Sequence, residues 1–228
     1  MLTCESLCKY YQSPKGMVKS LDEINLSVSK GEFLEVRGHS GSGKTTLLLT
    51  LGAMMHPTHG KVVFKGADLY RLNRAKRARV RSSSIGFVFQ MFHLLPYLDV
   101  VGNVLAGDDG NHSGARSKSE ALLQELGLGH RLNHLPNQLS AGEKQRVALA
   151  RAMVASPDLI LADEPTGNLD PENSKEVCRH LKRYQEKGGT VIVVTHGDAV
   201  HDFANRTIDL KAGEIISGPL VDHQADDA

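Results

Sequence analysis

The chain has 228 residues, which is enough for one well-packed core or for a main domain with a smaller lobe. Its formal net charge is +1 and charged residues make up 23% of it, so composition alone does not indicate a nucleic-acid-binding protein. No apolar run approaches the roughly 18 residues that a membrane-spanning helix needs, so we expect any membrane role to depend on another polypeptide.

The predicted elements begin with strands and a glycine-rich loop. Strand-like segments cover residues 2–7 and 24–28, and a third strand covers Phe33–Arg37. The loop follows this third strand and leads into a helix over residues 45–51. A strand, a glycine loop and a helix in this order are typical of a phosphate-binding unit.

The loop matches the pattern G-x-x-x-x-G-K-[ST] throughout. Its glycines allow consecutive backbone N–H groups to approach phosphate oxygens without a Cβ in the way. The alternative interpretation is a glycine-rich turn that binds no ligand. Lys44 can place its charge against the β- and γ-phosphates, and the Thr45 hydroxyl can ligate magnesium. We therefore expect a nucleotide site made by Gly38, His39, Ser40, Gly41, Ser42, Gly43, Lys44, Thr45 and Thr46.

The middle of the chain changes from mixed to mainly helical character. Short strands at 62–64 and 85–89 flank a basic helical stretch, and residues from about 91 to 155 indicate helices separated by Pro, Gly and Asn. We interpret this segment as an inserted helical lobe. The α/β pattern then returns, with a strand at 159–162, a helix at 171–186 and a strand at 190–195. Strands that alternate with helices predict a largely parallel sheet covered by helices.

Two acids follow the apolar strand at 159–162. A strand buried on both faces delivers its last residues to the carboxyl edge of the sheet, where open α/β proteins bind ligands. Asp163 would hold magnesium there, and Glu164 could polarise the water that attacks a γ-phosphate. Two acids after a strand could also belong to a solvated loop, but the phosphate loop favours the catalytic interpretation.

A further motif, Leu139-Ser140-Ala141-Gly142-Glu143, precedes a helix and lies shortly before the acidic strand. It resembles the signature L-S-G-G-Q of the ATP-binding-cassette family. The other landmarks of that family occur in the family's order, with matches at Tyr11, Gln90, Asn168-Leu169-Asp170 and His196. The resemblance covers about residues 2 to 216. It implies an α/β fold with a P-loop NTPase core, an N-terminal antiparallel β part and an inserted helical subdomain.

The resemblance also implies how a single cassette is organised and used. The ATPase core would comprise about residues 1–90 and 156–216, the helical subdomain about 91–155, and a polar tail 217–228. Two cassettes would form a homodimer on ATP binding, packed head to tail with ATP between them. Ser140 and Gly142 of one cassette would cap the γ-phosphate held by the other, and Asp170 would line the seam between them.

Within each site, the family supplies further roles, with ATP and Mg²⁺ as the implied cofactors. His196 would contact the γ-phosphate, Gln90 would sense magnesium and the attacking water, and Tyr11 would stack on adenine. The catalytic set would then be Glu164, His196, Gln90 and Lys44, and the magnesium ligands would be Thr45, Gln90 and Asp163.

Three positions depart from the family pattern. Ala141 replaces the first signature glycine, Glu143 replaces the terminal glutamine, and Gly197 follows His196 where an aspartate is common. We expect function to survive because Gly142, where the closest approach to phosphate would occur, is intact.

The stretches Asp163–Asp170 and Phe87–Pro96 resemble those of a group that includes the lipoprotein-release, macrolide-export and cell-division ATPases. The resemblance implies a cytoplasmic subunit, peripheral on the inner face of the membrane, that powers export, lipoprotein extraction or mechanotransmission by a separate permease. That partner would dock at Met91–Tyr97, on a surface formed by Phe92, Leu94, Leu95 and Tyr97. Core packing is an equal alternative for each of these four side chains.

Other interpretations stay open. The six basic residues within Arg71–Arg81 could contact nucleic acid or anionic lipid, but a solvated helix face is favoured because no aromatic platform accompanies them. We therefore expect no nucleic-acid partner. The alternative functions are a nucleotide-gated scaffold of a cell-division type complex and, less favoured, a non-transport cassette ATPase acting on nucleic acid. The chain has neither the CxxC pairs nor the sustained heptads of the latter class.

Overall fold

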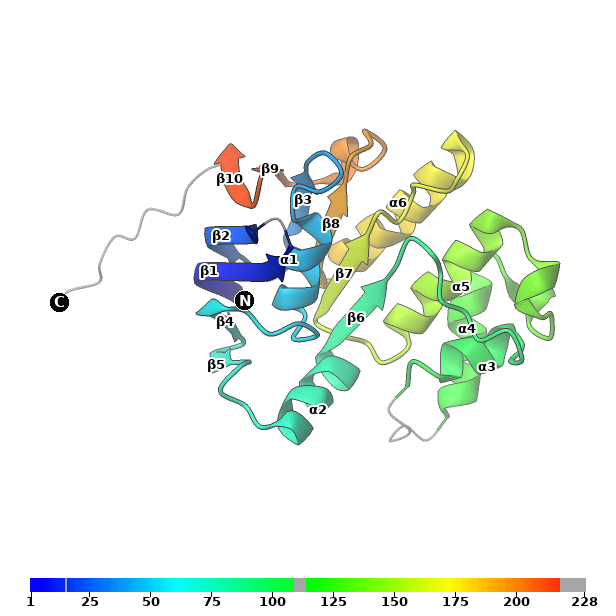
Figure 1. Cartoon of the computed structure of the whole chain (residues 1–228). Helices are drawn as coiled ribbons and strands as arrows, with labels where there is room; N and C mark the ends of the chain where they lie inside the picture. The colour runs from blue at the N-terminus through cyan, green and yellow to red at the C-terminus, as the bar shows by residue number, and fades with distance from the viewer. Residues whose placement is uncertain (15, 109–113, 218–228) are drawn as a thin grey trace.

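The computed structural model describes residues 1–14, 16–108 and 114–217 (Figure 1). From residue 218 onward, the predicted polar tail lies outside the described residues. Two β-sheets and several helices make up the described chain, and the phosphate loop lies between the larger sheet and helix α1 (Lys44–Leu51). No helix in these ranges combines the length and the apolar character that crossing a bilayer requires.

The first sheet is antiparallel. Its strands lie in the order β2-β1-β4-β5, with bounds Gly16–Val28 for β2, Leu2–Ser13 for β1, His59–Phe64 for β4 and Ala67–Asp68 for β5. Leu2 lies opposite Val28 and Ser13 lies opposite Gly16, so β1 and β2 extend well beyond the segments predicted for them. Their outer halves are largely exposed or half-buried. Alternation of apolar and polar residues therefore marks only the inner halves.

The second sheet carries the phosphate loop. Its six strands lie in the order β10-β9-β3-β8-β7-β6, and all but β10 run parallel. The strands are β3 (Phe33–Arg37), β6 (Ile85–Val88), β7 (Leu159–Asp163), β8 (Thr190–Thr195), β9 (Arg206–Lys211) and β10 (Glu214–Ser217). The predicted parallel sheet is confirmed, and β9 and β10 extend it. Because parallel strands end at one edge, β3, β7 and β8 deliver their following residues to the same place.

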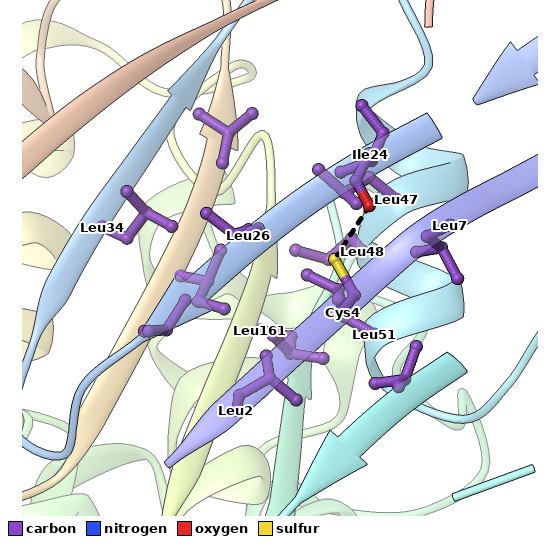
Figure 2. Packing of buried hydrophobic residues seen from close by; sticks show 14 of the residues in the cluster. Leu2, Cys4, Leu7, Ile24, Leu26, Leu34, Leu47, Leu48, Leu51 and Leu161 are labelled. Carbon is purple, nitrogen blue, oxygen red and sulfur yellow. Dashed lines mark hydrogen bonds between the residues drawn. The ribbon is translucent and has the colours of Figure 1, made fainter. Parts of the chain in front are cut away.

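Alternate residues of the central strands face two different layers. On one face, Leu34 and Leu161 belong to a cluster with Leu48 of α1 and Leu2 of β1, as Figure 2 shows. On the other face, Phe33 belongs to a second cluster that includes residues of α6 (Pro171–Glu186). Burial on both faces explains why these strands read as continuous apolar runs in the sequence.

Helices group at one side of the molecule in the segment predicted to be helical (Figure 1). They are α3 (Val100–Leu105), α4 (Ala115–Glu125) and α5 (Ala141–Met153), with short 3₁₀ turns at Gly129–Arg131 and Pro136–Gln138. Their apolar residues join the second cluster. Helix α2 (Arg74–Ser84) precedes β6 and buries none of its residues, which is consistent with a solvated basic face. A last 3₁₀ turn, η3 (His201–Phe203), follows β8.

Candidate nucleotide-binding site

The phosphate loop joins β3 to α1 and can be formed only with glycine at key positions. Gly43 has a φ of 106°, and a Cβ there would lie 2.2 Å from the Ser20 carbonyl oxygen. A Cβ on Gly38 would lie 2.4 Å from the Leu210 carbonyl oxygen. Both neighbours are backbone atoms that cannot move aside, so the loop packs directly against β2 and β9.

A cavity of about 440 Å³ opens between this loop and the ends of β7 and β8. It is lined by Ser20, His39, Ser40, Gly41, Gly43, Lys44, Thr45, Thr46, Gln90, Asp163, Glu164 and His196. All of these except Ser20 were singled out from the sequence. Ser20 donates a hydrogen bond to Thr46 at 2.8 Å, and no sequence motif marks it.

Lys44 places its ammonium group inside the cavity. Its side chain is only 7% exposed. Nζ donates to the carbonyl oxygens of Gly38 at 2.6 Å and His39 at 3.1 Å, and it lies 3.5 Å from Glu164 Oε1. Three oxygens therefore compensate this buried cation, as burial of a charge requires.

Glu164 connects the ends of β7 and β8. His196 Nδ1 lies 2.8 Å from Glu164 Oε1, and the His196 backbone N–H donates to Oε2 at 3.3 Å. Glu164 takes a φ of 45°, a left-handed conformation that costs energy for a residue other than glycine. The Glu164 N–H donates to the Val194 carbonyl at 2.9 Å, which helps to hold this strained turn. The carboxylate is thus held between Lys44 and His196.

Asp163 is buried beside Thr45. Burial raises the pKa of its carboxyl group, while a hydrogen bond with Thr45 and the Lys44 charge act in the opposite direction. Oδ1 has no hydrogen-bond partner within the described residues. No three His, Cys, Asp or Glu side chains gather into a metal cluster in the same ranges. A cation at Asp163 would therefore also need oxygens from hydroxyls, amides, water or phosphate.

Gln90 follows β6 and also lines the cavity. The Asn168 side-chain amide donates to the Gln90 carbonyl at 3.1 Å. This contact connects the segment after the two acids with the start of the segment predicted to dock a partner.

Six predicted residues do not line the cavity: Gly38 and Ser42 of the phosphate loop, and Tyr11, Ser140, Gly142 and Asp170. The Tyr11 hydroxyl donates to Met55 Sδ at 2.9 Å, and Lys9 Nζ lies 5.2 Å from the ring centroid. Stacking of Tyr11 on adenine therefore stays a prediction.

The signature segment forms the start of α5. The Ser140 hydroxyl accepts from the Glu143 N–H at 3.2 Å, and the Glu143 carboxylate accepts from the Ser140 N–H at 2.8 Å. Glu143 also pairs with Arg131 at 2.8 Å. Glu143 is therefore a capping residue, a role that the spacing S-x-x-E signals and that we did not assign from the sequence.

The start of α6 lies next to this segment. Asp170 caps α6 and accepts hydrogen bonds from the backbone N–H groups of Asn173 and Glu172, which lower the pKa of its carboxyl group. A Cβ on Gly142 would lie 2.1 Å from Asn173 Oδ1. A Cβ at this position would therefore force the Asn173 side chain to move where α5 approaches α6.

The predicted docking segment combines exposed and packed residues. Met91 and Tyr97 are exposed, whereas Leu94 packs against the second cluster. Phe92 and His93 both take positive φ values, and Arg151 near the end of α5 donates to both of their carbonyl oxygens. Core packing therefore explains an apolar side chain at Leu94, but it does not explain one at the exposed position of Tyr97.

Proteins of known family resemble this chain in both sequence and structure. The family model described as ABC transporter matches residues 21–167. The lipoprotein-releasing system ATP-binding protein LolD of Geobacter metallireducens is 45% identical over 223 residues, which cover 95% of this chain and 98% of LolD. The macrolide export ATP-binding/permease protein MacB of Shewanella sp. is 41% identical over 95% of this chain but only 34% of its own length. A dimeric post-hydrolysis structure of the ATP-binding cassette MJ0796 bound to ADP and Pi has a TM-score of 0.89, 37% identity, and coverage of 96% and 98%.

Proposed function

Because this chain belongs to the ABC transporter family as an ATP-binding subunit, we propose that it hydrolyses ATP with Mg²⁺ and thereby drives a separate membrane subunit. The observation that carries this proposal is the convergence of Lys44, Glu164 and His196 in one cavity beside the phosphate loop. A cation for the phosphates, a carboxylate base and an imidazole are the groups that phosphoryl transfer to water needs.

Each side chain would act at a particular point of the reaction. Backbone N–H groups of the loop and Lys44 would bind the phosphate oxygens, and Lys44 would exchange its carbonyl partners for them. Glu164 would accept a proton from the attacking water, and His196 would donate a hydrogen bond to the γ-phosphate. The existing contact between Glu164 and His196 would keep both groups on the same side of the reacting phosphorus.

The residues present fit a magnesium ion. Thr45, Asp163 and Gln90 would hold it, since all three line the cavity and Asp163 Oδ1 has no hydrogen-bond partner among the described residues. When bound, Mg²⁺ would neutralise negative charge that develops on the phosphate oxygens.

The signature segment would complete the site in a second copy of the chain. Ser140 and Gly142 lie at the first turn of α5, where free backbone N–H groups and the helix dipole favour an anion. Because they do not line the cavity of their own chain, a head-to-tail homodimer would bring them to the γ-phosphate held by the partner. Asp170 would then lie at the seam.

The membrane partner would dock at Met91–Tyr97 and hold the chain at the cytoplasmic face of the membrane. The similarity to LolD and MacB favours lipoprotein release or export as the process that is powered. We also propose the division into an ATPase core (about 1–90 and 156–216) and a helical subdomain (about 91–155).

The variant Glu164→Gln tests this proposal. Hydrolysis, measured as phosphate release, should fall about 10²- to 10⁴-fold while ATP still binds, because only the proton acceptor is lost. Purified from its native membranes with ATP and Mg²⁺, the variant should bring a membrane subunit with it. If only soluble or nucleic-acid partners co-purify, the transport role is wrong and the ATPase role survives.

Comparison with Lys44→Ala separates a motor from a nucleotide-gated scaffold. A motor loses its cellular function in both variants. If Glu164→Gln kept full function and Lys44→Ala lost it, ATP binding alone would suffice, and the scaffold would replace the motor.

A further inference from the structure

A buried carboxylate lies in the middle of the strand that precedes the phosphate loop. Glu35 is on β3 with an exposure of 0%. It shares its face of the strand with Phe33 and Arg37, because side chains two residues apart point the same way. Phe33 belongs to the apolar cluster beneath α6, so Glu35 is a charged group within an otherwise apolar layer. Such a group is tolerated only if other residues compensate it.

Two side chains from later parts of the chain contact one oxygen of Glu35, Oε2, whereas Oε1 is buried without a hydrogen-bond partner among the described residues. His201 Nδ1 lies 3.0 Å from Oε2, and the Thr207 hydroxyl donates to the same oxygen at 2.8 Å. His201 belongs to η3, the turn that follows β8, and 56% of its side chain is exposed. The carboxylate therefore fixes a turn at the surface from within the core.

Arg37 makes a second contact with the same turn. Its guanidinium group hydrogen-bonds to the carboxylate of Asp198, which is 88% exposed. Asp198 lies two residues after His196 and three before His201. Glu35 and Arg37 thus contact two points, Asp198 and His201, of the short segment that follows His196.

We propose that these two contacts, Glu35–His201 and Arg37–Asp198, form a clamp that positions His196 over the phosphate loop. None of these four residues lines the cavity. They would act only by holding the segment that carries His196, so they are positioning residues. This inference rests on the proposed contact of His196 with the γ-phosphate. The new element is that β3, the strand that leads into the phosphate loop, would also determine the position of His196.

The clamp has a specific consequence for nucleotide selection. His196 is 61% exposed, and its only described side-chain contact is with Glu164. Without the clamp, its segment would adopt several positions, and the contact with the γ-phosphate would be weakened. ADP has no γ-phosphate, so its binding would be unaffected. Loss of the clamp should therefore lower the preference for ATP over ADP and slow hydrolysis.

The test uses Asp198→Asn and Glu35→Gln, which change charge with little change in volume. We expect kcat to fall roughly 3- to 30-fold in each variant, the range of couplings that pass through packed contacts, while the Kd for ADP changes less than about 2-fold. The affinity for ATP, measured in a Glu164→Gln background, should fall. The double variant with the charges exchanged, Arg37→Asp with Asp198→Arg, should have a higher kcat than Arg37→Asp or Asp198→Arg alone, because it restores the ion pair.

The matched control is Asp158→Asn, which breaks the ion pair of Asp158 with Lys65 at the opposite edge of the sheet. It should leave both affinities and kcat unchanged. His196→Ala distinguishes the two possible failures. If His196→Ala itself leaves the ATP preference intact, the proposed role of His196 fails. If it removes the preference but the clamp variants do not, the clamp is overturned. Equal weakening of ATP and ADP would likewise overturn it, because that outcome indicates only structural support.

Discussion

Two regions that would contact the same phosphate differ in how their polar groups are satisfied. At the carboxyl edge of the large sheet, Asp163 Oδ1 and Ser42 Oγ are buried without a hydrogen-bond partner among the described residues. At the start of α5, Ser140 and Glu143 satisfy each other reciprocally, and Arg131 neutralises the carboxylate. The sheet edge thus has buried polar atoms without partners, whereas the Ser140 and Glu143 side chains of the signature segment are already hydrogen-bonded within their own chain.

This difference bears on how a shared site would be assembled. The sheet edge is shaped for a ligand, because buried polar atoms without partners are costly unless something binds them. The signature segment is folded and capped in advance, so it would dock without rearranging its backbone. The order of events would then be nucleotide binding at the sheet edge first and capping by a second chain afterwards.

The largest expected effect separates the two regions directly. Lys44→Ala should lower hydrolysis about 10²- to 10³-fold by removing a preorganised charge. Ser140→Asp keeps a good helix cap but places a negative charge against the γ-phosphate, so it should lower hydrolysis similarly with nucleotide binding retained. Phosphate release measures both, and Lys61→Ala, which breaks an exposed ion pair with Glu5, is the control.

Mixing the two inactive variants sharpens the comparison. In a head-to-tail dimer, each mixed pair has one intact site, built from the loop of one chain and the signature segment of the other. Equal amounts should therefore recover about one quarter of the wild-type rate, since half of the dimers are mixed and one of two sites works. Failure to recover any activity would contradict sharing of the site.

A smaller effect concerns the buried carboxyl group of Asp163 at the sheet edge, whose Oδ1 has no hydrogen-bond partner among the described residues. Burial raises the pKa of the Asp163 carboxyl group. The free energy of unfolding therefore decreases as the pH rises from the ordinary pKa of aspartate to the raised pKa, and it decreases no further above that pH. Asp163→Asn removes the buried charge and should raise Tm at pH 7 by roughly 2–4 °C. Thermal unfolding should show the gain shrinking toward pH 4. A variant that is less stable than the wild type at pH 7 would contradict this account.

The smallest effect concerns the completed cap. Burial raises the pKa of Glu143, but hydrogen bonds from Ser140 and the charge of Arg131 outweigh it, so the pKa is lowered overall. Its contribution to stability is present above the ordinary pKa of glutamate and is lost as the pH falls through the lowered value. Glu143→Gln keeps the acceptor for Ser140 but loses the ion pair, so it should cost about 0.5 kcal/mol, or roughly 1–2 °C in Tm. In unfolding experiments, the difference should shrink as the pH falls below the ordinary pKa of glutamate and vanish only below the lowered value.

The sequence predicted most of the sheet edge because its residues follow strands in a recognisable order. Asp163 ends a buried strand, His196 directly follows one, and Lys44 directly follows the glycine loop, so their convergence follows from a parallel sheet. The Ser140–Glu143 pair was readable from its spacing, but comparison with a family pattern presented Glu143 as a departure. Local rules would have identified its capping role.

Other features could not be predicted because they depend on distant contacts. Glu35 meets His201 across 166 positions of the chain, and a carboxylate in a short apolar strand gives no sign of its partner. The outer parts of β1 and β2 are largely exposed or half-buried and lack the alternation that marks a strand. Tyr11 lies there, which is why its orientation toward a nucleotide could not be derived from the pattern.

Helix α5 joins two surfaces that different molecules would contact. Its first turn carries Ser140 and Gly142, and Arg151, near its end, holds the carbonyl groups of Phe92 and His93. A helix of 13 residues is about 20 Å long and bends little over that length. It therefore behaves as a stiff rod. A tilt produced where a second chain closed on the γ-phosphate would then appear at the far end as a displacement of the exposed turn around Tyr97. A single backbone segment would in this way connect ATP hydrolysis to movement of the membrane partner.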